Sequence, residues 1–169
     1  MNDVKYIEFI TKLRDTIYRL ARSIIGDDAE AEDVMQDICE RVWRARDKVL
    51  SYSNPQAYVC RMTRNLAIDH QRAKRHKELF AKDIESQTAM SDGNKDANIS
   101  DMAVLTLKLI QQLPEPQRTI IHLRDIEGYE MADIAEIVER DESTVRVALS
   151  RARKSIRLKL IEIMNYGVK

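Results

Sequence analysis

The sequence predicts an all-helical protein built from two small helical units. Only 4 Gly and 3 Pro occur in 169 residues, which leaves too few turn residues for a fold rich in β-strands. Long stretches without these helix breakers are rich in Ala, Leu, Arg and Glu, which are good helix formers. Apolar residues make up 44% of the chain, enough to form a buried core.

The first two helices are predicted over residues 6–25 and 29–48. Apolar side chains in residues 6–25 recur at the three-four spacing of a single buried helix face. Gly26 follows, in the position where a helix end favours a left-handed residue. Asp27 and Asp28 are suitable N-cap residues for the second helix.

A break at residues 51–55 precedes the third helix. Asn54 is a natural N-cap and Pro55 is a natural first helical residue, so we expect a helix from there to about residue 77. Residues 81–100 have few apolar side chains and no helical periodicity, which predicts a flexible linker. The predicted organisation is therefore a first domain over residues 1–80, the linker, and a second domain over residues 101–169.

The second domain is predicted to contain a helix-turn-helix. The expected helices cover residues 101–112, 117–127, 131–138 and 143–163, with Gly128 ending the second of them. A short helix, a tight turn over residues 139–142 and a longer helix is the arrangement of that motif. In DNA-binding proteins the second helix of the motif lies in the major groove.

Charge is balanced over the whole chain but not along it. The 28 Lys and Arg offset the 28 Asp and Glu, so the formal net charge is zero. Residues 27–40 and 130–142 are strongly acidic, whereas residues 61–77 and 143–160 are strongly basic. An acidic segment followed by a basic one in each half suggests a polyanion as one partner and a basic protein surface as another. The alternative is that these helix faces are solvated or pair with each other.

The basic second helix of the motif carries the candidate duplex-binding residues. Val145 and Leu149 are expected to pack on Ile134 and Val138, which turns the polar side chains outward. The candidates, among them two N-cap hydroxyls able to contact phosphate, are Ser143, Thr144, Arg146, Ser150, Arg153 and Arg157. The arginine guanidinium can bind guanine edges and phosphates through two parallel hydrogen bonds. The competing interpretation is a basic helix that only covers a core or binds an acidic protein.

Two further helix faces are weaker candidates when judged from the residues alone. The basic third helix carries hydrogen-bonding side chains such as Asn65, but only Tyr52 and Tyr58 are near to stack on bases. The residues alone therefore favour a solvated helix over a nucleic-acid-binding one. The second helix has a polar edge that could meet a basic protein surface; it comprises Asp33, Gln36, Asp37 and Glu40. Its alternative is plain solvation, with Trp43 in the core.

Nothing in the sequence indicates catalysis, a cofactor or a metal site. The three histidines lack the i, i+4 spacing of a helical metal site, and Cys39 and Cys60 are too few for a zinc cluster. No apolar run approaches the roughly 20 residues of a membrane span, and the first residues do not have the pattern of a secretory signal. We therefore expect a cytoplasmic protein without membrane insertion that is not an enzyme.

The motifs in the two halves together resemble the extracytoplasmic-function (ECF) sigma factors. Residues 28–43 (DAEAEDVMQDICERVW) and residues 57–72 (AYVCRMTRNLAIDHQR) are similar to sigma region 2. The matching segments for region 4 are Leu113-Pro114 through Arg118, DIEG at residues 125–128, DIA at 133–135, TVR at 144–146 and LSRAR at 149–153. The resemblance covers nearly the whole chain outside the predicted linker.

This resemblance implies a subunit that brings bacterial RNA polymerase to promoters, with no catalytic role of its own. Region 2 would dock on the polymerase core through Asp33, Gln36, Asp37 and Glu40. It would recognise and open the −10 element through Ser51, Tyr52, Asn54, Arg61, Arg64, Asn65, Arg72 and Arg75. The region 4 helix-turn-helix would bind duplex DNA at the −35 element through the candidates given above. The resemblance also implies an inhibitory anti-sigma partner.

Three residues depart from the family pattern in the helix-turn-helix. Glu139 replaces the usual glycine of the turn, where a left-handed backbone costs a non-glycine residue on the order of 1 kcal/mol. Glu130 replaces the usual Ser or Thr cap, and Ala148 stands where a basic residue is common. The competing functions are a helix-turn-helix regulator without sigma activity and a protein-interaction module. A helix-turn-helix regulator does not need an acidic helix followed by a basic one ahead of the linker.

Overall fold

The computed structural model describes residues 2–81 and 101–166, and the described residues are almost entirely helical. The first half contains α1 (Asn2–Ile25), α2 (Asp28–Arg44), α3 (Arg46–Ser51) and α4 (Pro55–Ala81). The second half contains α5 (Asp101–Gln111), α6 (Gln117–Ile121), the π-helical turn η1 (His122–Ile126), α7 (Met131–Val138) and α8 (Glu142–Tyr166). The predicted linker lies outside the described residues, apart from Ala81.

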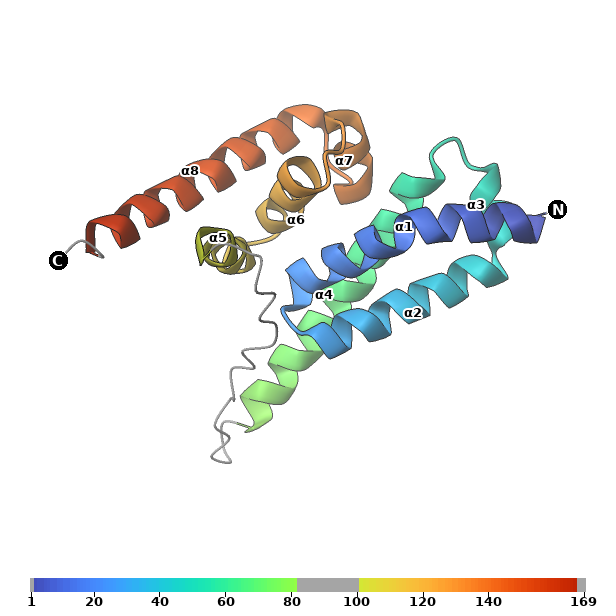
Figure 1. Cartoon of the computed structure of the whole chain (residues 1–169), viewed down its shortest axis with the longest axis horizontal. Coiled ribbons are helices and arrows are strands. Elements are labelled where there is room, and N and C mark those ends of the chain that lie inside the picture. Colours follow the sequence, from blue (N-terminus) through green and yellow to red (C-terminus); the bar gives the residue numbers. More distant parts are fainter. Residues whose placement is uncertain (1, 82–100, 167–169) are drawn as a thin grey trace.

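The long helices α1, α2 and α4 make up most of the first half, with the short α3 between α2 and α4 in the chain (Figure 1). α1 packs against both α2 and α4, and its buried face includes Leu13, Ile17, Leu20 and Ile24. Gly26 has a left-handed backbone with φ of 78°, and the side chain of Asp27 accepts a hydrogen bond from the Glu30 backbone N–H at 3.0 Å. The helix end and the N-cap predicted at these positions are confirmed.

The second predicted helix is divided in two. Ala45, between α2 and α3, has φ of −109° and ψ of 21°, outside helical geometry, and the chain resumes as the short α3. The break before α4 is placed as predicted, and the Asn54 side chain accepts a hydrogen bond from the Ala57 backbone N–H at 3.1 Å.

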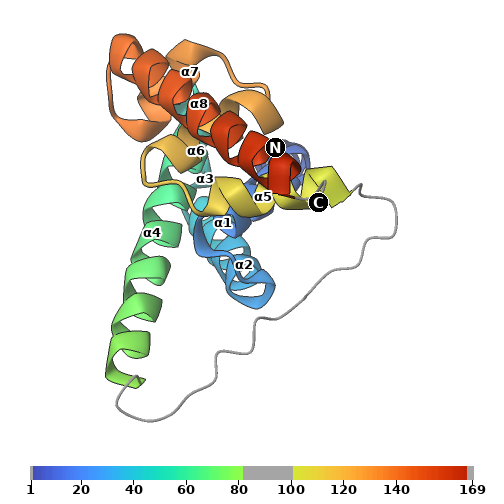
Figure 2. The same cartoon turned by 90° about the vertical axis from the view of Figure 1, so that its left-hand side faces the viewer.

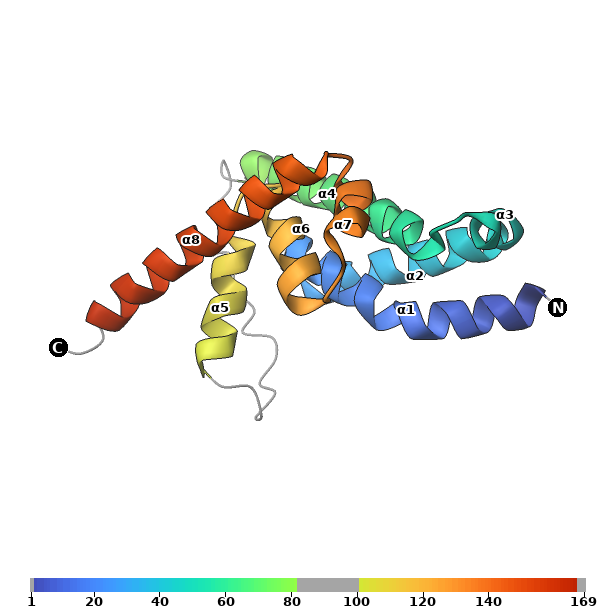
Figure 3. The same ribbon diagram turned by 90° about the horizontal axis from the view of Figure 1, so that it is seen from above.

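The second half stacks α6 and α7 between α8 and the first half (Figures 1 and 3). Seen from the side in Figure 2, α7 and α8 lie over the N-terminal end of α4. α7 and α8 form the predicted helix-turn-helix, with Glu139 in the turn at φ of 56°. The turn therefore keeps its left-handed conformation although glycine is absent. The helix predicted over residues 117–127 instead changes from α6 to η1 at His122.

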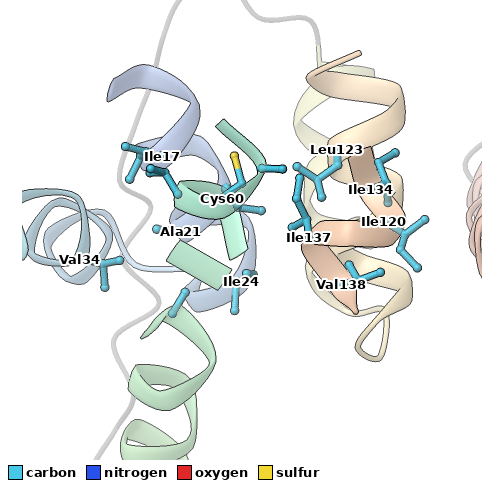
Figure 4. Close-up of a cluster of buried hydrophobic side chains, with 14 of the residues drawn as sticks. Ile17, Ala21, Ile24, Val34, Cys60, Ile120, Leu123, Ile134, Ile137 and Val138 are labelled. Carbon is cyan, nitrogen blue, oxygen red and sulfur yellow. The ribbon is translucent and has the colours of Figure 1, made fainter. Parts of the chain in front are cut away.

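One apolar core runs through both halves. Ile17, Ala21, Ile24 and Cys60 of the first half lie across from Leu123 and Ile137 of the second half in Figure 4, and all six belong to one cluster of buried residues. The guanidinium of Arg118, almost fully buried, donates to the backbone carbonyl of Ile24 at 2.7 Å and to that of Leu113 at 3.0 Å. The two halves are thus packed together by apolar contacts and by a buried arginine that satisfies two carbonyl groups.

Candidate nucleic-acid and protein interfaces

The basic helix α8 presents one apolar and one polar face. Val145, Leu149, Ala152 and Ile156 are buried and hold the helix against the rest of the second half. All six candidate duplex-binding residues are exposed: Ser143, Thr144, Arg146, Ser150, Arg153 and Arg157. The structure therefore places the whole predicted set at the surface of the second helix of the motif.

Two of these arginines already have acidic partners within the chain. Arg146 donates to Glu142 at 3.2 Å, one helical turn earlier. Arg153 forms two hydrogen bonds with the carboxylate of Asp125, at 2.5 and 3.0 Å, and these bonds raise the pKa of Arg153. Arg157 has no such partner among the described residues. The contact with Asp125 joins η1 to α8, and no spacing in the sequence indicates this pairing.

The prediction that Ser143 and Thr144 cap α8 is wrong. α8 begins at Glu142, so the residue before the helix is Asp141. Its carboxylate accepts a hydrogen bond from the Thr144 backbone N–H at 2.9 Å, and hydrogen bonds from Thr144 lower the pKa of Asp141. Ser143 and Thr144 therefore lie in the first turn, with exposed side chains, rather than at the cap.

The predicted −10 residues divide into an exposed group and a covered group. Ser51, Asn65, Arg72 and Arg75 are exposed. Tyr52 is half-buried and lies against Tyr58, with 4.8 Å between ring centroids. Asn54, Arg61 and Arg64 are also half-buried.

The three covered polar residues each meet a side chain of the second half. Asn54 donates from Nδ2 to Oδ1 of Asp133 at 2.9 Å. Nη1 of Arg61 lies 4.0 Å from Oε1 of Glu139, and Nε of Arg64 lies 3.6 Å from Oε2 of Glu115. The acidic segment 130–142 thus contacts the basic face of α4, a pairing that remained an alternative in the sequence.

The polar edge of α2 is at the surface. Asp33, Gln36 and Glu40 are exposed and Asp37 is half-buried. Asp37 and Glu40 pair with arginines four residues later, Arg41 and Arg44. Asp33 has no ion-pair partner among the described residues, so the uncompensated negative charge of this edge lies towards the N-terminal end of the helix.

Trp43 is not a core residue. Its side chain is 39% exposed, packs edge-on against Tyr6 and carries the guanidinium of Arg46 over its ring at 4.0 Å. The spacing of Val34, Ile38 and Val42 already defines the buried face of α2, and Trp43 lies one residue outside it. Cys39 is half-buried beside that face.

A buried ionic cluster also joins the two halves, and no pattern in the sequence indicates it. Glu127, with 5% of its side chain exposed, accepts from Arg19 at 2.8 and 3.0 Å and contacts Nε2 of His122 at 3.2 Å. Burial by itself would raise the pKa of Glu127, but hydrogen bonds from Arg19 and His122 lower it to about 2. Glu127 is therefore a carboxylate at neutral pH and ties the second half to α1.

Comparisons with known proteins show which family this chain resembles. Residues 9–77 match the family model for sigma-70 region 2, and residues 104–156 match that for sigma-70 region 4. The RNA polymerase sigma-H factor of Pseudomonas aeruginosa is 30% identical over an aligned length of 157, and the match covers 87% of this chain and 81% of that protein. The ECF RNA polymerase sigma factor SigW of Bacillus subtilis is 27% identical over an aligned length of 168, and the match covers 94% of this chain and 90% of SigW.

One relative is much longer than this chain. The probable RNA polymerase sigma factor RfaY of Xanthomonas campestris is 26% identical over 163 residues, and the match spans 93% of this chain but 40% of that protein. The fold is shared with the sigma factor RpoE of Bartonella quintana, solved in complex with the anti-sigma factor NepR. That likeness has a TM-score of 0.76 at 23% identity and covers 96% of this chain and 99% of RpoE.

Both sigma regions are present in the family order, with the acidic helix and basic helix in the first and the helix-turn-helix in the second. None of the helices within residues 2–81 and 101–166 is long and apolar enough to cross a membrane. The chain belongs to the extracytoplasmic-function family of RNA polymerase sigma factors.

Proposed function

We propose that this sigma factor docks on core RNA polymerase through the polar edge of α2 and directs initiation through two DNA-binding surfaces. α8 binds the duplex −35 element, and α4 with the loop before it captures the melted −10 element. The reaction chemistry belongs to the polymerase core, and this chain supplies no catalytic residue. Initiation takes place in the cytoplasm, where the bacterial polymerase transcribes the chromosome.

The polar face of α8 is the observation that carries this proposal. Arg146 lies at the start of the second turn, still near the N-terminal end of the helix, where a recognition helix reaches base edges. Arg153 and Arg157 lie about two and three turns further along, where the helix leaves the groove and meets the sugar-phosphate backbone. Arg146 is therefore assigned to base recognition, and Arg157 to phosphate binding.

The −10 surface is proposed on α4 and its N-terminal loop. Asn65, Arg72 and Arg75 are exposed along α4 and provide hydrogen bonds and positive charge for a single strand. The tilted pair of Tyr52 and Tyr58, at the N-terminal end of α4, offers an aromatic surface. Capturing an unstacked base costs a few kcal/mol, which contacts with such a surface offset.

Docking on the polymerase is proposed through the α2 edge because acidic side chains favour a basic protein surface over DNA. Asp33 is the strongest candidate, since it is exposed and lacks the helical arginine partners of Asp37 and Glu40. An anti-sigma partner is proposed by extension from two structural neighbours, RpoE with NepR and CnrH with the cytosolic domain of CnrY.

The test is reconstitution with purified core polymerase. Templates are selected from a random promoter library, and the chain is expected to confer transcription from a defined promoter class that core polymerase alone does not transcribe. Under the alternative of a helix-turn-helix regulator, the chain would instead form a stable dimer, bind a specific duplex without polymerase and leave core polymerase unselective. That outcome would refute the proposal.

A further inference from the structure

One arginine of the −35 surface is held by a carboxylate from outside its own helix. Arg153 donates from Nε to Oδ2 of Asp125 at 3.0 Å and from Nη2 to Oδ1 at 2.5 Å. Two nitrogens and two oxygens thus form a bidentate pair, which fixes the plane of the guanidinium as well as its position. Arg146, by contrast, has one hydrogen bond, to Glu142 of its own helix.

Both ends of this pair are attached to the apolar core. Asp125 belongs to η1, and Leu123 of the same π-helical turn is fully buried. Arg153 follows Ala152, which is also fully buried, and α8 packs against α6, the helix that continues into η1 (Figure 1). The guanidinium is therefore held on a rigid part of the second half, although the Arg153 side chain is 48% exposed.

The pair leaves one edge of the guanidinium available to a ligand. Arginine has five N–H donors, and Asp125 accepts one from Nε and one from Nη2 of Arg153. The remaining donors, on Nη1 and Nη2, include the two parallel N–H groups at the end of the side chain. A phosphate presents two oxygens that can accept both of these hydrogen bonds.

The place of Arg153 on α8 assigns this edge to a phosphate rather than to a base. Arg146 and Arg153 are seven residues apart, which is about two turns, so they lie on the same side of the helix about 10 Å apart. The major groove is about 12 Å wide. When Arg146 lies over the base edges, Arg153 therefore reaches the wall of the groove, where the sugar-phosphate backbone runs.

Charge alone does not explain a carboxylate at this position. Asp125 is exposed beside a helix proposed to meet phosphates, and its negative charge by itself repels them. Preorganisation offsets this repulsion. A guanidinium that is already fixed in its bound orientation loses less side-chain freedom when DNA binds.

We propose that Asp125 is a positioning residue for −35 binding, which holds Arg153 so that the end edge of its guanidinium binds one phosphate at the wall of the major groove. This inference rests on the proposed −35 role of α8. Asp125 itself does not touch the DNA and acts only through Arg153. The anchored phosphate sets the register of α8 on the duplex, which Arg146 needs in order to reach its base.

The first experiment measures how tightly the reconstituted holoenzyme binds the −35 duplex of a promoter selected with it. The variant Asp125→Asn keeps the shape of the side chain but cannot accept both arginine hydrogen bonds. Its matched control, Glu136→Gln, removes the same charge at an exposed residue of α7. Charge alone predicts that neither change weakens binding. We expect Asp125→Asn to weaken it about fivefold, the loss that follows from immobilising one arginine side chain, and Glu136→Gln not to weaken it.

A double-variant cycle tests whether Asp125 acts through Arg153. Arg153→Ala should weaken binding and lower the salt slope by about 0.9, the value for one phosphate. Adding Asp125→Asn to Arg153→Ala should cause no further loss, because the side chain that Asp125 positions is then absent. If Asp125→Asn causes the same loss in both backgrounds, Asp125 does not act through Arg153 and the inference is wrong.

A phosphate scan separates positioning from a purely structural role. Each phosphate of the −35 duplex is replaced in turn by an uncharged methylphosphonate. One replacement should weaken binding by the wild type and by Glu136→Gln, and should have much less effect on Asp125→Asn and Arg153→Ala. A general distortion of η1 would instead leave Asp125→Asn as sensitive as the wild type at every position, and that result would overturn the inference.

The proposed function and the positioning role fail in different ways. A wild-type holoenzyme that selects no promoter refutes the proposed function and, with it, this inference. A wild-type holoenzyme that initiates normally, while Asp125→Asn binds the −35 duplex as tightly as Glu136→Gln does, refutes the positioning role alone.

Discussion

Glu127 offers a quantitative test of the packing between the two halves. The variant Glu127→Gln keeps the size of the side chain and removes the negative charge that Arg19 and His122 contact. Lowering the pKa from its ordinary value of 4.5 to about 2 corresponds to roughly 3 kcal/mol of stability at neutral pH, at 1.36 kcal/mol per unit. Because Arg19 is 48% exposed, water screens part of its attraction to Glu127. We therefore expect the unfolding free energy of the variant to be lower by about 2 kcal/mol.

The pH dependence of this loss has a definite sign. A carboxyl group whose pKa is lower in the folded state stabilises that state above the unfolded pKa, and the stabilisation is lost as the pH falls towards the folded pKa. The difference in unfolding free energy between wild type and Glu127→Gln should therefore be constant above about pH 5.5. It should shrink by about 1 kcal/mol between about pH 4.5 and 3.5.

The assay is urea unfolding followed by circular dichroism at a series of pH values, with both proteins measured in parallel. Other carboxylates also titrate in this range, but they are common to the two proteins and cancel in the difference. Glu8→Gln, at an exposed residue of α1, serves as the control and should follow the wild type. If the free-energy difference between wild type and Glu127→Gln stays constant down to about pH 3.5, the role assigned to the Glu127 carboxylate is refuted.

The remaining predictions concern the surfaces and the turn. Asp33→Lys with Asp37→Lys should weaken binding to core polymerase while stability changes by about 0.5 kcal/mol or less, and a folded double variant with full affinity would remove the docking assignment. Arg146→Ala in the holoenzyme should cost roughly 1–3 kcal/mol and relax preference at one or two −35 positions, whereas Arg157→Ala should weaken all sequences alike and lower the salt slope by about one phosphate. Equal weakening of every −35 variant by Arg146→Ala would contradict the groove assignment. Glu139→Gly should raise thermal stability, because relief of about 1 kcal/mol of backbone strain exceeds the loss of a long contact with Arg61.

Local features of the fold could be predicted from the sequence because their causes are local. Gly26, Asp27 and Asn54 each act on backbone groups within four residues, so residue type and position were enough to place helix ends. The buried faces of α1 and α8 followed from apolar spacing. The cap of α8 lies two or three residues before the predicted positions, because Asp141, Ser143 and Thr144 are all good cap residues and only the backbone distinguishes them.

The contacts between the halves could not be predicted in the same way. The acidic segment 130–142 and the basic face of α4 were recognised as charged blocks, but sequence alone does not tell whether such blocks pair with each other or with other molecules. The ion pair of Glu127 is still harder to predict, because its partner Arg19 is 108 residues away in the sequence. No motif or spacing distinguishes Glu127 from the other acidic residues. The π-helical turn that positions it has no signal in the apolar spacing.

The charge pattern of the chain acquires a physical reason from this packing. Arginines that bind DNA in one state need counter-charges in the other, because a half-buried guanidinium without a partner is costly. Glu139, in the turn after α7, and Glu115, in the loop before α6, supply them at separations of 4.0 and 3.6 Å. Neither separation is that of a short hydrogen bond, and the partly exposed Arg61–Glu139 pair contributes at most about 1 kcal/mol. Such weak pairs can be exchanged for phosphates, whose binding also releases counterions. A net charge of zero, with the two signs kept in separate segments, therefore lets the same arginines serve a closed subunit and an open promoter complex.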